Sequence, residues 1–284
     1  MRTHKLKGML SLFRPELSLA AGICVFTGQV LAAGGLPDWR AGLLGFACAF
    51  FLSAAALILN DVFDYEVDRI NAPQRALPSG AVSRAEAVGL TAVVSLAGLV
   101  AALLLGWDVF FLSIPIWLLG VFYNWRGKES SLPGNLMVSA SVAVTFLLGA
   151  LTVGQLWNGL VWIFSGMAFF IDFGEEIAGD AMDMEGDRQR GSRSLALLYG
   201  RKAALRLAIG LWGVVIALSF LPVLLGLMRP IYLIFLLIMD ALIVYFSLRL
   251  LRSAAPAEGR KAMRGVYLGA TLCVLVFVIA QLIG

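Results

Sequence analysis

Two groups of acidic side chains in this chain have the spacing of residues on one face of a helix. The first group directly follows a long apolar run and consists of Asp61, Asp64 and Asp68, with Asn71 further on. The second group follows another apolar run far along the chain and consists of Asp172, Glu176, Asp180, Asp183 and Asp187. Because an α-helix has about 3.6 residues per turn, side chains three, four or seven positions apart lie on the same side. Each group therefore predicts an acidic stripe along one helix.

Oxygen-rich stripes of this kind are suited to binding metal ions. Neighbouring carboxylates repel one another, and charges close to a bilayer are costly unless they are compensated. Carboxylate and amide oxygens are hard ligands that suit Mg²⁺, which completes its coordination shell with water and substrate phosphate. Two facing stripes would therefore clamp a diphosphate through metal ions. The alternative, a solvated helix end with capping and surface acids, gives no reason for two stripes in register.

Basic residues lie close to both stripes in the sequence. They are Arg69, Arg75, Lys128, Arg188, Arg190 and Arg193. Guanidinium and ammonium groups neutralise phosphate oxygens and donate hydrogen bonds to them. We expect some of these residues to contact a phosphorylated substrate and the others to orient the chain in a membrane.

The composition predicts the elements that carry the stripes. The chain is 60% hydrophobic and 14% charged, with a mean hydropathy of +0.89, whereas a soluble domain carries roughly 25% charged residues. Apolar runs long enough to cross about 30 Å of hydrocarbon recur throughout. We expect an all-α polytopic membrane protein, a single domain over residues 1–284 with about nine transmembrane helices around a central cavity. The expected spans are roughly 17–35, 41–60, 85–105, 108–125, 136–154, 157–176, 205–226, 230–248 and 264–283.

The distribution of Lys and Arg predicts the orientation. If the nine spans alternate, all of the 22 Lys and Arg residues except Arg40 and Arg229 fall on one side. The positive-inside rule makes that side cytoplasmic. We therefore expect a multi-pass protein of the cell membrane whose acidic stripes open to the cytoplasm. The net charge of +4 says little about nucleic acid, because the basic residues lie at the membrane surface, and we expect no nucleic-acid partner.

A short internal repeat relates the two stripes. Asp61, Asp64 and Asp68 precede "RALPSG", and three aspartates at a constant offset of 119 residues precede "RSLALLYG". Each unit reads as an apolar span, an acidic helix end, an Arg-containing loop with Gly, and the next span. This predicts two pseudo-symmetric halves that face one another.

These motifs resemble those of the UbiA superfamily of intramembrane prenyltransferases. The family signature N-D-x-x-D-x-x-x-D is matched by Asn60, Asp61, Asp64 and Asp68, followed by Asn71, Arg75, Pro78 and Gly80. Its D-x-x-x-D signature is matched by Asp183 and Asp187, followed by Gly191. The stretch "YNWRGKESSLPGN" is similar to the loop after the family's fourth span, through Tyr123, Lys128 and Asn135.

The resemblance implies Mg²⁺-dependent transfer of an isoprenyl group from a polyprenyl diphosphate donor to a lipid or aromatic acceptor, within membrane lipid. It implies metal ligands at Asn60, Asp64, Asp68, Asp180, Asp183 and Asp187. It implies catalytic roles for Asp61, Asp64, Asp68, Asp183 and Asp187. It implies diphosphate contacts at Arg75, Tyr123, Lys128 and Arg193.

A more specific resemblance indicates which acceptor to expect. The run "EEIAGDAMDMEGDR" is similar to the digeranylgeranylglyceryl phosphate synthases, although Glu175 stands where their pattern has Arg. This implies geranylgeranyl diphosphate as donor and geranylgeranylglyceryl phosphate as acceptor. The run "EGDRQRGSRSL" is also similar to chlorophyll synthases, so an aromatic acceptor such as 4-hydroxybenzoate or a chlorophyllide stays open. Glu176, Asp180 and a phosphate oxygen are alternative bases for the acceptor proton.

A divalent-cation transporter is the alternative from a different class, because intramembrane acids often mark ion paths. In this sequence the acids gather at the cytoplasmic ends of the spans, which favours the enzyme. Asp240 is the exception, in the middle of a span. It is expected either to form a hydrogen bond between helices or to line a cavity.

Overall fold

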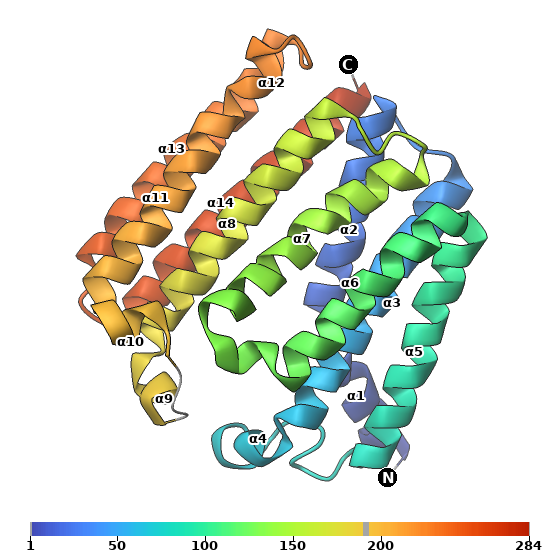
Figure 1. The fold of residues 1–284 in the computed structure, drawn as a ribbon, viewed down its shortest axis with the longest axis vertical. Helices are drawn as coiled ribbons and strands as arrows, with labels where there is room; N and C mark the ends of the chain where they lie inside the picture. The colour runs from blue at the N-terminus through green and yellow to red at the C-terminus, as the bar shows by residue number, and fades with distance from the viewer. Residues whose placement is uncertain (1, 190–192, 284) are drawn as a thin grey trace.

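The computed structural model describes residues 2–189 and 193–283, which form helices and no strand. Nine long helices stand side by side (Figure 1). They are α2 (Pro15–Ala33), α3 (Trp39–Phe63), α5 (Arg84–Leu105), α6 (Trp107–Trp125), α7 (Leu132–Thr152), α8 (Gly159–Met182), α11 (Arg201–Ser219), α13 (Leu233–Arg252) and α14 (Pro256–Ile283). The short elements are α1 (Arg2–Leu12), α4 (Tyr65–Asn71), η1 (Gly127–Ser130), α9 (Met184–Gln189), α10 (Leu195–Tyr199), α12 (Leu221–Leu224) and η2 (Pro230–Tyr232).

Eight of the long helices are long and apolar enough to cross a membrane, counting α12 with α11 and η2 with α13. This supports a multi-pass membrane protein. The remaining expected span, 157–176, corresponds to α8, which has 24 residues but carries several carboxylates in its second half. The total of nine spans therefore stays a prediction. Consistent with an odd number, α1 begins at the lower end of the bundle and α14 ends at the upper end (Figure 1).

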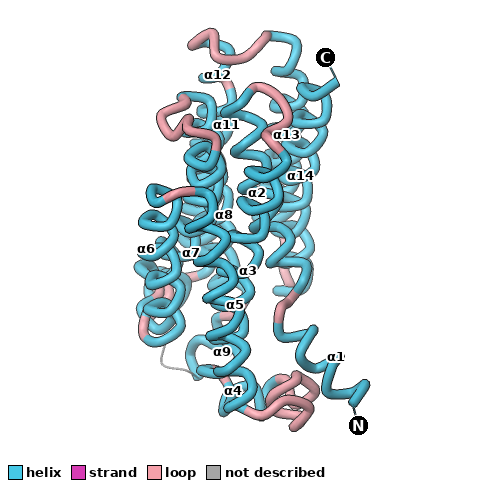
Figure 2. The backbone as a smooth tube through the Cα atoms, turned by 90° about the vertical axis from the view of Figure 1, so that its right-hand side faces the viewer, coloured by secondary structure: helices cyan, strands magenta, loops and turns pink. Residues whose placement is uncertain are grey.

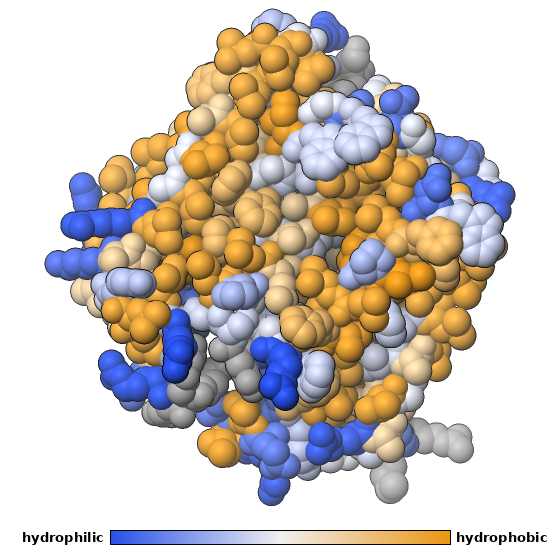
Figure 3. Space-filling model, viewed as in Figure 1, coloured by the Kyte–Doolittle hydropathy of each residue, from blue (hydrophilic) through white to orange (hydrophobic). Residues whose placement is uncertain are grey.

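The surface has the pattern of a membrane protein. Large apolar side chains point outward from several helices, including Leu43, Val93 and Leu272, each more than 60% exposed. Figure 3 shows apolar side chains over the middle of one face, with hydrophilic side chains gathered along its lower, left and upper right margins. Contact of so large an apolar surface with water is unfavourable, whereas contact with lipid tails carries no such cost.

Helices α2 and α7 approach each other closely where glycines face the neighbouring backbone. A Cβ atom on Gly28 would lie 2.2 Å from the carbonyl oxygen of Phe146, and one on Gly149 would lie 2.2 Å from that of Val25. Small residues permit such close approach between membrane helices. Buried Gln29 adds a polar contact, because its Nε2 donates to Thr152 Oγ1 at 2.8 Å.

Neither acidic stripe lies on a single uninterrupted helix, so that expectation was wrong. The chain turns at Asp64, between α3 and α4, and at Asp183, between α8 and α9. Both residues have ψ close to 0°, at 7° and 15°, which lies outside the helical range. Each turn residue ends one series of i to i−4 hydrogen bonds, since Asp64 N donates to Asn60 O at 2.9 Å and Asp183 N donates to Gly179 O at 3.0 Å, and its own carbonyl accepts the first such bond of the next helix, from Asp68 N or Asp187 N. The identical interruption supports the predicted repeat.

Asp240 on α13 forms a hydrogen bond between helices. The hydroxyl of Ser219 at the end of α11 donates to Asp240 Oδ2 at 2.7 Å. Both side chains are buried. Of the two roles expected for Asp240, the structure supports the contact between helices.

Candidate active site

Both acidic motifs lie at the same end of the bundle. Helices α4 and α9, which carry the last aspartates of each motif, both lie at the lower end of the bundle, the end at which α1 also lies (Figures 1 and 2). The loops that carry the predicted diphosphate ligands reach the same end, since η1 contacts α6 and α7 there. The fold thus gathers at one end motifs that are far apart in the chain.

In the first motif, Asp61 and Asp68 form one cluster with two arginines. Arg75 Nη1 donates to both carboxylate oxygens of Asp68, at 2.8 and 2.7 Å, and lies 3.7 Å from Asp61 Oδ1. Arg14 donates to Asp61. Burial alone would lower the pKa of Arg75, but its bonds to Asp68 and the charges of Asp61 and Asp64 raise it above its usual value. Arg75 therefore stays charged beside the buried carboxylates.

Arg14 is a site residue that the sequence analysis missed. Its guanidinium also lies 3.4 Å from Asn60 Oδ1. The backbone of Arg14 has φ 40°, a left-handed conformation that is uncommon for a residue with a side chain. In the sequence, Arg14 is a single arginine before Pro15 and lies 47 residues from Asp61. No local pattern links the two residues. Beside this contact lies a cavity of about 470 Å³, whose lining includes Arg14, Asp61, Gln74 and Arg75.

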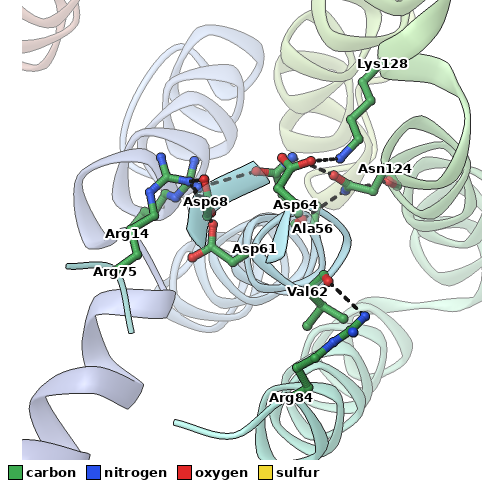
Figure 4. Close-up of polar contacts among 12 residues, drawn as sticks. Arg14, Ala56, Asp61, Val62, Asp64, Asp68, Arg75, Arg84, Asn124 and Lys128 are labelled. Atoms are coloured by element: carbon green, nitrogen blue, oxygen red, sulfur yellow. Dashed lines mark hydrogen bonds and ion pairs between the residues drawn. The ribbon is translucent and has the colours of Figure 1, made fainter. Parts of the chain in front are cut away.

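Asp64 faces away from this cluster (Figure 4). Its carboxylate accepts a bond from Lys128, which lies in η1 beyond the fourth long helix. Beside it, Asn60 Nδ2 donates to Asn124 Oδ1 at 3.0 Å, and Asn124 is itself held by backbone carbonyls of α3 and α6. The sequence analysis did not select Asn124. The three aspartates therefore do not share one face, because the chain turns at Asp64.

The second motif is oriented by α7. Asn135 Nδ2 donates to Asp180 Oδ2 at 3.0 Å, and Ser139 Oγ donates to Asp172 Oδ2 at 2.8 Å. At the turn after α8, Arg260 Nη1 donates to Asp183 Oδ1 at 2.5 Å. Arg260, like Arg14, was not among the predicted site residues.

Tyr123 connects the two motifs. Its phenol on α6 lies close enough to Asp64, Glu176 and Asp180 to interact with their charges. Tyr123, a predicted diphosphate ligand, is therefore within electrostatic range of carboxylates from both motifs. Asp187 continues the second motif on α9, where its N–H donates to Asp183 O at 3.0 Å.

The remaining basic candidates lie further out. Arg69 and Arg188 pair with exposed glutamates three residues away, at 3.3 and 3.2 Å, instead of with the aspartates. Arg193 is exposed and forms no hydrogen bond or ion pair with a described residue. Arg190 and Gly191 lie outside the described residues. Of the predicted diphosphate ligands, Arg75, Tyr123 and Lys128 thus lie beside the motif aspartates.

The donor atoms fit Mg²⁺ only if the substrate completes the shell. The described residues contain no group of three or more His, Cys, Asp or Glu side chains placed to hold a metal ion alone. Mg²⁺ is commonly held by one or two carboxylates together with waters and phosphate oxygens. Such a pair would be Asp64 with Asp68 or Asp183 with Asp187, but Asp64 points to Lys128 and Asp68 to Arg75 in this structure, so these side chains would have to turn towards a shared ion. The cations beside Asp64 and Asp183 show that both carboxylates attract positive charge.

Replacing Arg14 with glutamine is expected to destabilise the protein. Asp61, whose side chain is 8% exposed, would keep only Arg75 at 3.7 Å. Removing one partner of a buried ion pair leaves a poorly compensated charge, so we expect a loss of about 1–3 kcal/mol. Thermal unfolding in detergent would measure it. The control is Lys7→Gln, an exposed residue of α1, expected to change stability by less than about 0.5 kcal/mol. Equal melting temperatures for the two variants would contradict the role of Arg14.

Comparisons with known proteins place this chain in a family. The model of the UbiA prenyltransferase family matches residues 21–279. The chain is 33% identical over 284 residues to the digeranylgeranylglyceryl phosphate synthase of Thermococcus kodakarensis, covering 98% of this chain and 99% of that protein. It is also 33% identical over 264 residues to the synthase of the same name from Pyrococcus furiosus, covering 92% and 93%.

Solved structures agree with these relatives. A structure of a digeranylgeranylglyceryl phosphate synthase superposes with a TM-score of 0.82 at 30% identity and covers 98% of both chains. A UbiA homolog from Archaeoglobus fulgidus bound to GPP and Mg²⁺ superposes with a TM-score of 0.72 at 17% identity, covering 98% of this chain and 100% of that chain. The chain therefore belongs to the UbiA prenyltransferase family and has the fold of that family.

Proposed function

We propose that this chain is a Mg²⁺-dependent enzyme that transfers a geranylgeranyl group from geranylgeranyl diphosphate to geranylgeranylglyceryl phosphate. The observation that carries the proposal is the meeting of two aspartate motifs at one end of the bundle, with Lys128 and Tyr123 beside them. The names of the archaeal relatives support the acceptor. The GPP and Mg²⁺ bound to the A. fulgidus homolog support the class of donor and the metal.

The reaction breaks the allylic C–O bond of the donor and forms a C–O bond to the acceptor hydroxyl, which loses its proton. When bound, Mg²⁺ would offset the charge that develops on the leaving diphosphate. Asp64 and Asp68 would hold it from one motif and Asp183 and Asp187 from the other, with Asn60 and Asp180 as further oxygen donors. These roles extend the family resemblance to residues that the fold brings together.

Other side chains of the site would bind and orient the donor. Lys128 would move from Asp64 to a diphosphate oxygen, since an ammonium donates equally well to phosphate. Arg75 would keep Asp68 in place while its second nitrogen remains able to contact phosphate, because a guanidinium carries five N–H donors. The apolar helices around the site would keep water from an allylic cation, which water destroys.

Two carboxylates of α8 are candidates for the base that takes the proton from the acceptor hydroxyl. Glu176 lies on α8 one turn before Asp180 and near the Tyr123 phenol. It is half-buried, with solvent-accessible surface remaining. We propose Glu176 ahead of Asp180, because Asp180 is held by Asn135 and proposed as a metal ligand.

The competing functions differ in the acceptor or in the reaction. A 4-hydroxybenzoate-like or chlorophyllide acceptor would use the same aspartates, and Glu175 in place of the synthases' Arg is the residue that keeps it open. Membership of a prenyltransferase family argues against a cation transporter.

The purified protein should be incubated with Mg²⁺, geranylgeranyl diphosphate and one acceptor at a time. The acceptors are geranylgeranylglyceryl phosphate, 4-hydroxybenzoate and a chlorophyllide. Mass spectrometry is expected to detect the digeranylgeranyl lipid; products from the aromatic acceptors alone would overturn the proposed acceptor.

We also propose that the protein lies in the cell membrane with its acidic motifs on the cytoplasmic side. The positive-inside rule supports this orientation. Ser79→Cys, in the exposed loop after α4, is expected to react with an impermeant thiol reagent only after the cells are opened. Gln155→Cys, exposed between α7 and α8, is the matched position at the opposite end and is expected to react in intact cells.

The reverse labelling pattern would contradict the orientation. The background is low, because Cys48 and Cys273 are buried and Cys24 is partly buried. The unsubstituted chain measures that background directly.

A further inference from the structure

Arg260 contacts the second aspartate motif but is not one of the residues proposed to hold the metal, bind the donor or accept the proton. It lies in the first turns of α14, and its Nη1 donates to Asp183 Oδ1 at 2.5 Å. Both side chains are open to solvent, with 53% of Arg260 and 58% of Asp183 exposed. Exposed ion pairs contribute at most about 1 kcal/mol, so this pair does not serve mainly to stabilise the fold. The guanidinium is free to exchange its partner.

The pseudo-symmetry of the fold gives Arg260 a counterpart. Helix α3 packs between α2 and α5, and α8 packs in the same way between α7 and α11. Helix α5 then contacts α6, and α11 contacts α13. The order α2, α3, α5, α6 in the first half thus corresponds to α7, α8, α11, α13 in the second. Helix α7 follows the first set and α14 follows the second.

Several local features follow this correspondence. Arg14 before α2 and Ser131 before α7 both have positive φ, at 40° and 55°, and both helices have Pro in their first turn. Asp64 and Asp183 both mark the turn after the second helix of their half. Gly80 and Gly200 both have positive φ, at 74° and 86°, in the loops that follow.

The same correspondence relates two cations. Lys128 comes after the fourth helix of the first half and pairs with Asp64. Arg260 comes after the fourth helix of the second half and pairs with Asp183. Each turn aspartate therefore has one basic partner from the segment after the fourth helix of its half, with Lys128 in η1 just before α7 and Arg260 in the second turn of α14. Neither pairing is visible in the sequence repeat, which ends at the loop before the third helix.

The position of Arg260 is fixed by packing around it. A Cβ atom on Gly259 would lie 2.1 Å from Met182 Sδ, so the first turns of α14 lie directly against the end of α8. Arg201 holds the preceding loop, since its Nη1 donates to Ser253 O and its Nη2 to Ser253 Oγ, both at 2.9 Å. Arg260 is thereby held beside the second aspartate motif.

The geometry points to Arg260 as a phosphate-binding residue of the active site, the counterpart of Lys128 in the second half. The assignment rests on the proposed function and adds a substrate contact to it. The ligand is a substrate phosphate group, either the diphosphate of the donor or the phosphate of the acceptor. Arg is suited to bidentate phosphate binding.

The test measures binding by Arg260→Gln with two probes. Inorganic diphosphate with Mg²⁺ represents the donor, and geranylgeranylglyceryl phosphate represents the acceptor, each titrated calorimetrically into detergent-solubilised protein. We expect at least about a tenfold loss of affinity for one of them, with a matching rise in KM for that substrate and a smaller change in kcat. Arg260→Lys should recover part of the loss. Lys261→Gln, the exposed neighbour, should bind both probes as the unmodified protein does.

The probe that loses affinity identifies the source of the phosphate. Unchanged affinity for both probes and unchanged KM values, in an Arg260→Gln variant that still transfers the prenyl group, would overturn the assignment while leaving the proposed function intact. A loss of kcat of the same size, with unchanged affinity for both probes, would also overturn the assignment, since that result means that Arg260 only positions Asp183. Absence of transfer by the unmodified protein would instead contradict the proposed function.

Discussion

Asp64→Ala and Asp187→Ala are each expected to lower prenyl transfer at least about 10²-fold, because each removes an oxygen ligand of a metal ion that offsets charge on the leaving group. Turnover of geranylgeranyl diphosphate at saturating Mg²⁺ measures the effect. Stability should fall much less than activity. Asp64→Ala leaves Lys128 without its carboxylate partner, but the two side chains are 23% and 27% exposed, so the metal-free protein should lose at most about 1 kcal/mol of stability.

The two motifs provide matched controls. Glu66 and Glu185 stand between the motif aspartates in the sequence, but their side chains are 73% and 76% exposed and pair with neighbouring arginines. Glu66→Gln and Glu185→Gln should keep transfer within about twofold, consistent with surface charge substitutions. Near-normal transfer by both aspartate variants in folded protein would show that the motifs do not act through metal ions.

Removal of divalent metal ions is expected to have the largest effect of all. With a chelator present, diphosphate release should fall at least about 10³-fold, since the metal contribution amounts to several kcal/mol. Adding back Mg²⁺ or Mn²⁺ should restore it. Ca²⁺ should restore less, because it is larger and prefers six to eight oxygen ligands with looser geometry. Mg²⁺ together with diphosphate should also raise the melting temperature, as ligands of the native state do.

A chelator that leaves transfer unchanged would contradict the metal requirement. The melting temperature measured with chelator alone is the control, because a structural metal would lower it. The aspartates are already paired with Arg14, Arg75, Lys128 and Arg260. We therefore expect the metal-free protein to stay folded.

Much of the fold could be predicted from apolar runs, because the bilayer imposes both length and hydropathy on each span. The ends of the helices were less predictable. The last span was expected at 264–283, but α14 begins at Pro256, since its first two turns are charged and lie beyond the apolar run. The same limit applies to α8, where the carboxylates of its second half lower the hydropathy of a continuous helix.

The turns at Asp64 and Asp183 could not be predicted from periodicity. The acids on both sides of each turn keep the three- and four-residue spacing of a straight helix in the sequence, so the pattern does not reveal the turn. A change of ψ at one residue nevertheless directs Asp64 towards Lys128 while Asp61 faces Arg14 (Figure 4).

Contacts between distant segments could not be predicted from the sequence either. Asn124 orients Asn60 across 64 residues, and Arg260 reaches Asp183 across 77. A single asparagine or arginine has no local pattern that reveals its partner. The residues that the sequence could select as candidates were those inside spaced motifs, where helical geometry relates neighbours directly.

The most direct test of the two-motif clamp is a structure with Mn²⁺ and an unreactive thio-analogue of geranylgeranyl diphosphate. Anomalous scattering locates Mn²⁺, which replaces Mg²⁺ at oxygen ligands. The account predicts metal ions bound at both motifs, with Asp64 and Asp68 on one side, Asp183 and Asp187 on the other, and the diphosphate between them. Metal bound by one motif alone, or a diphosphate bound away from the aspartates, would contradict it.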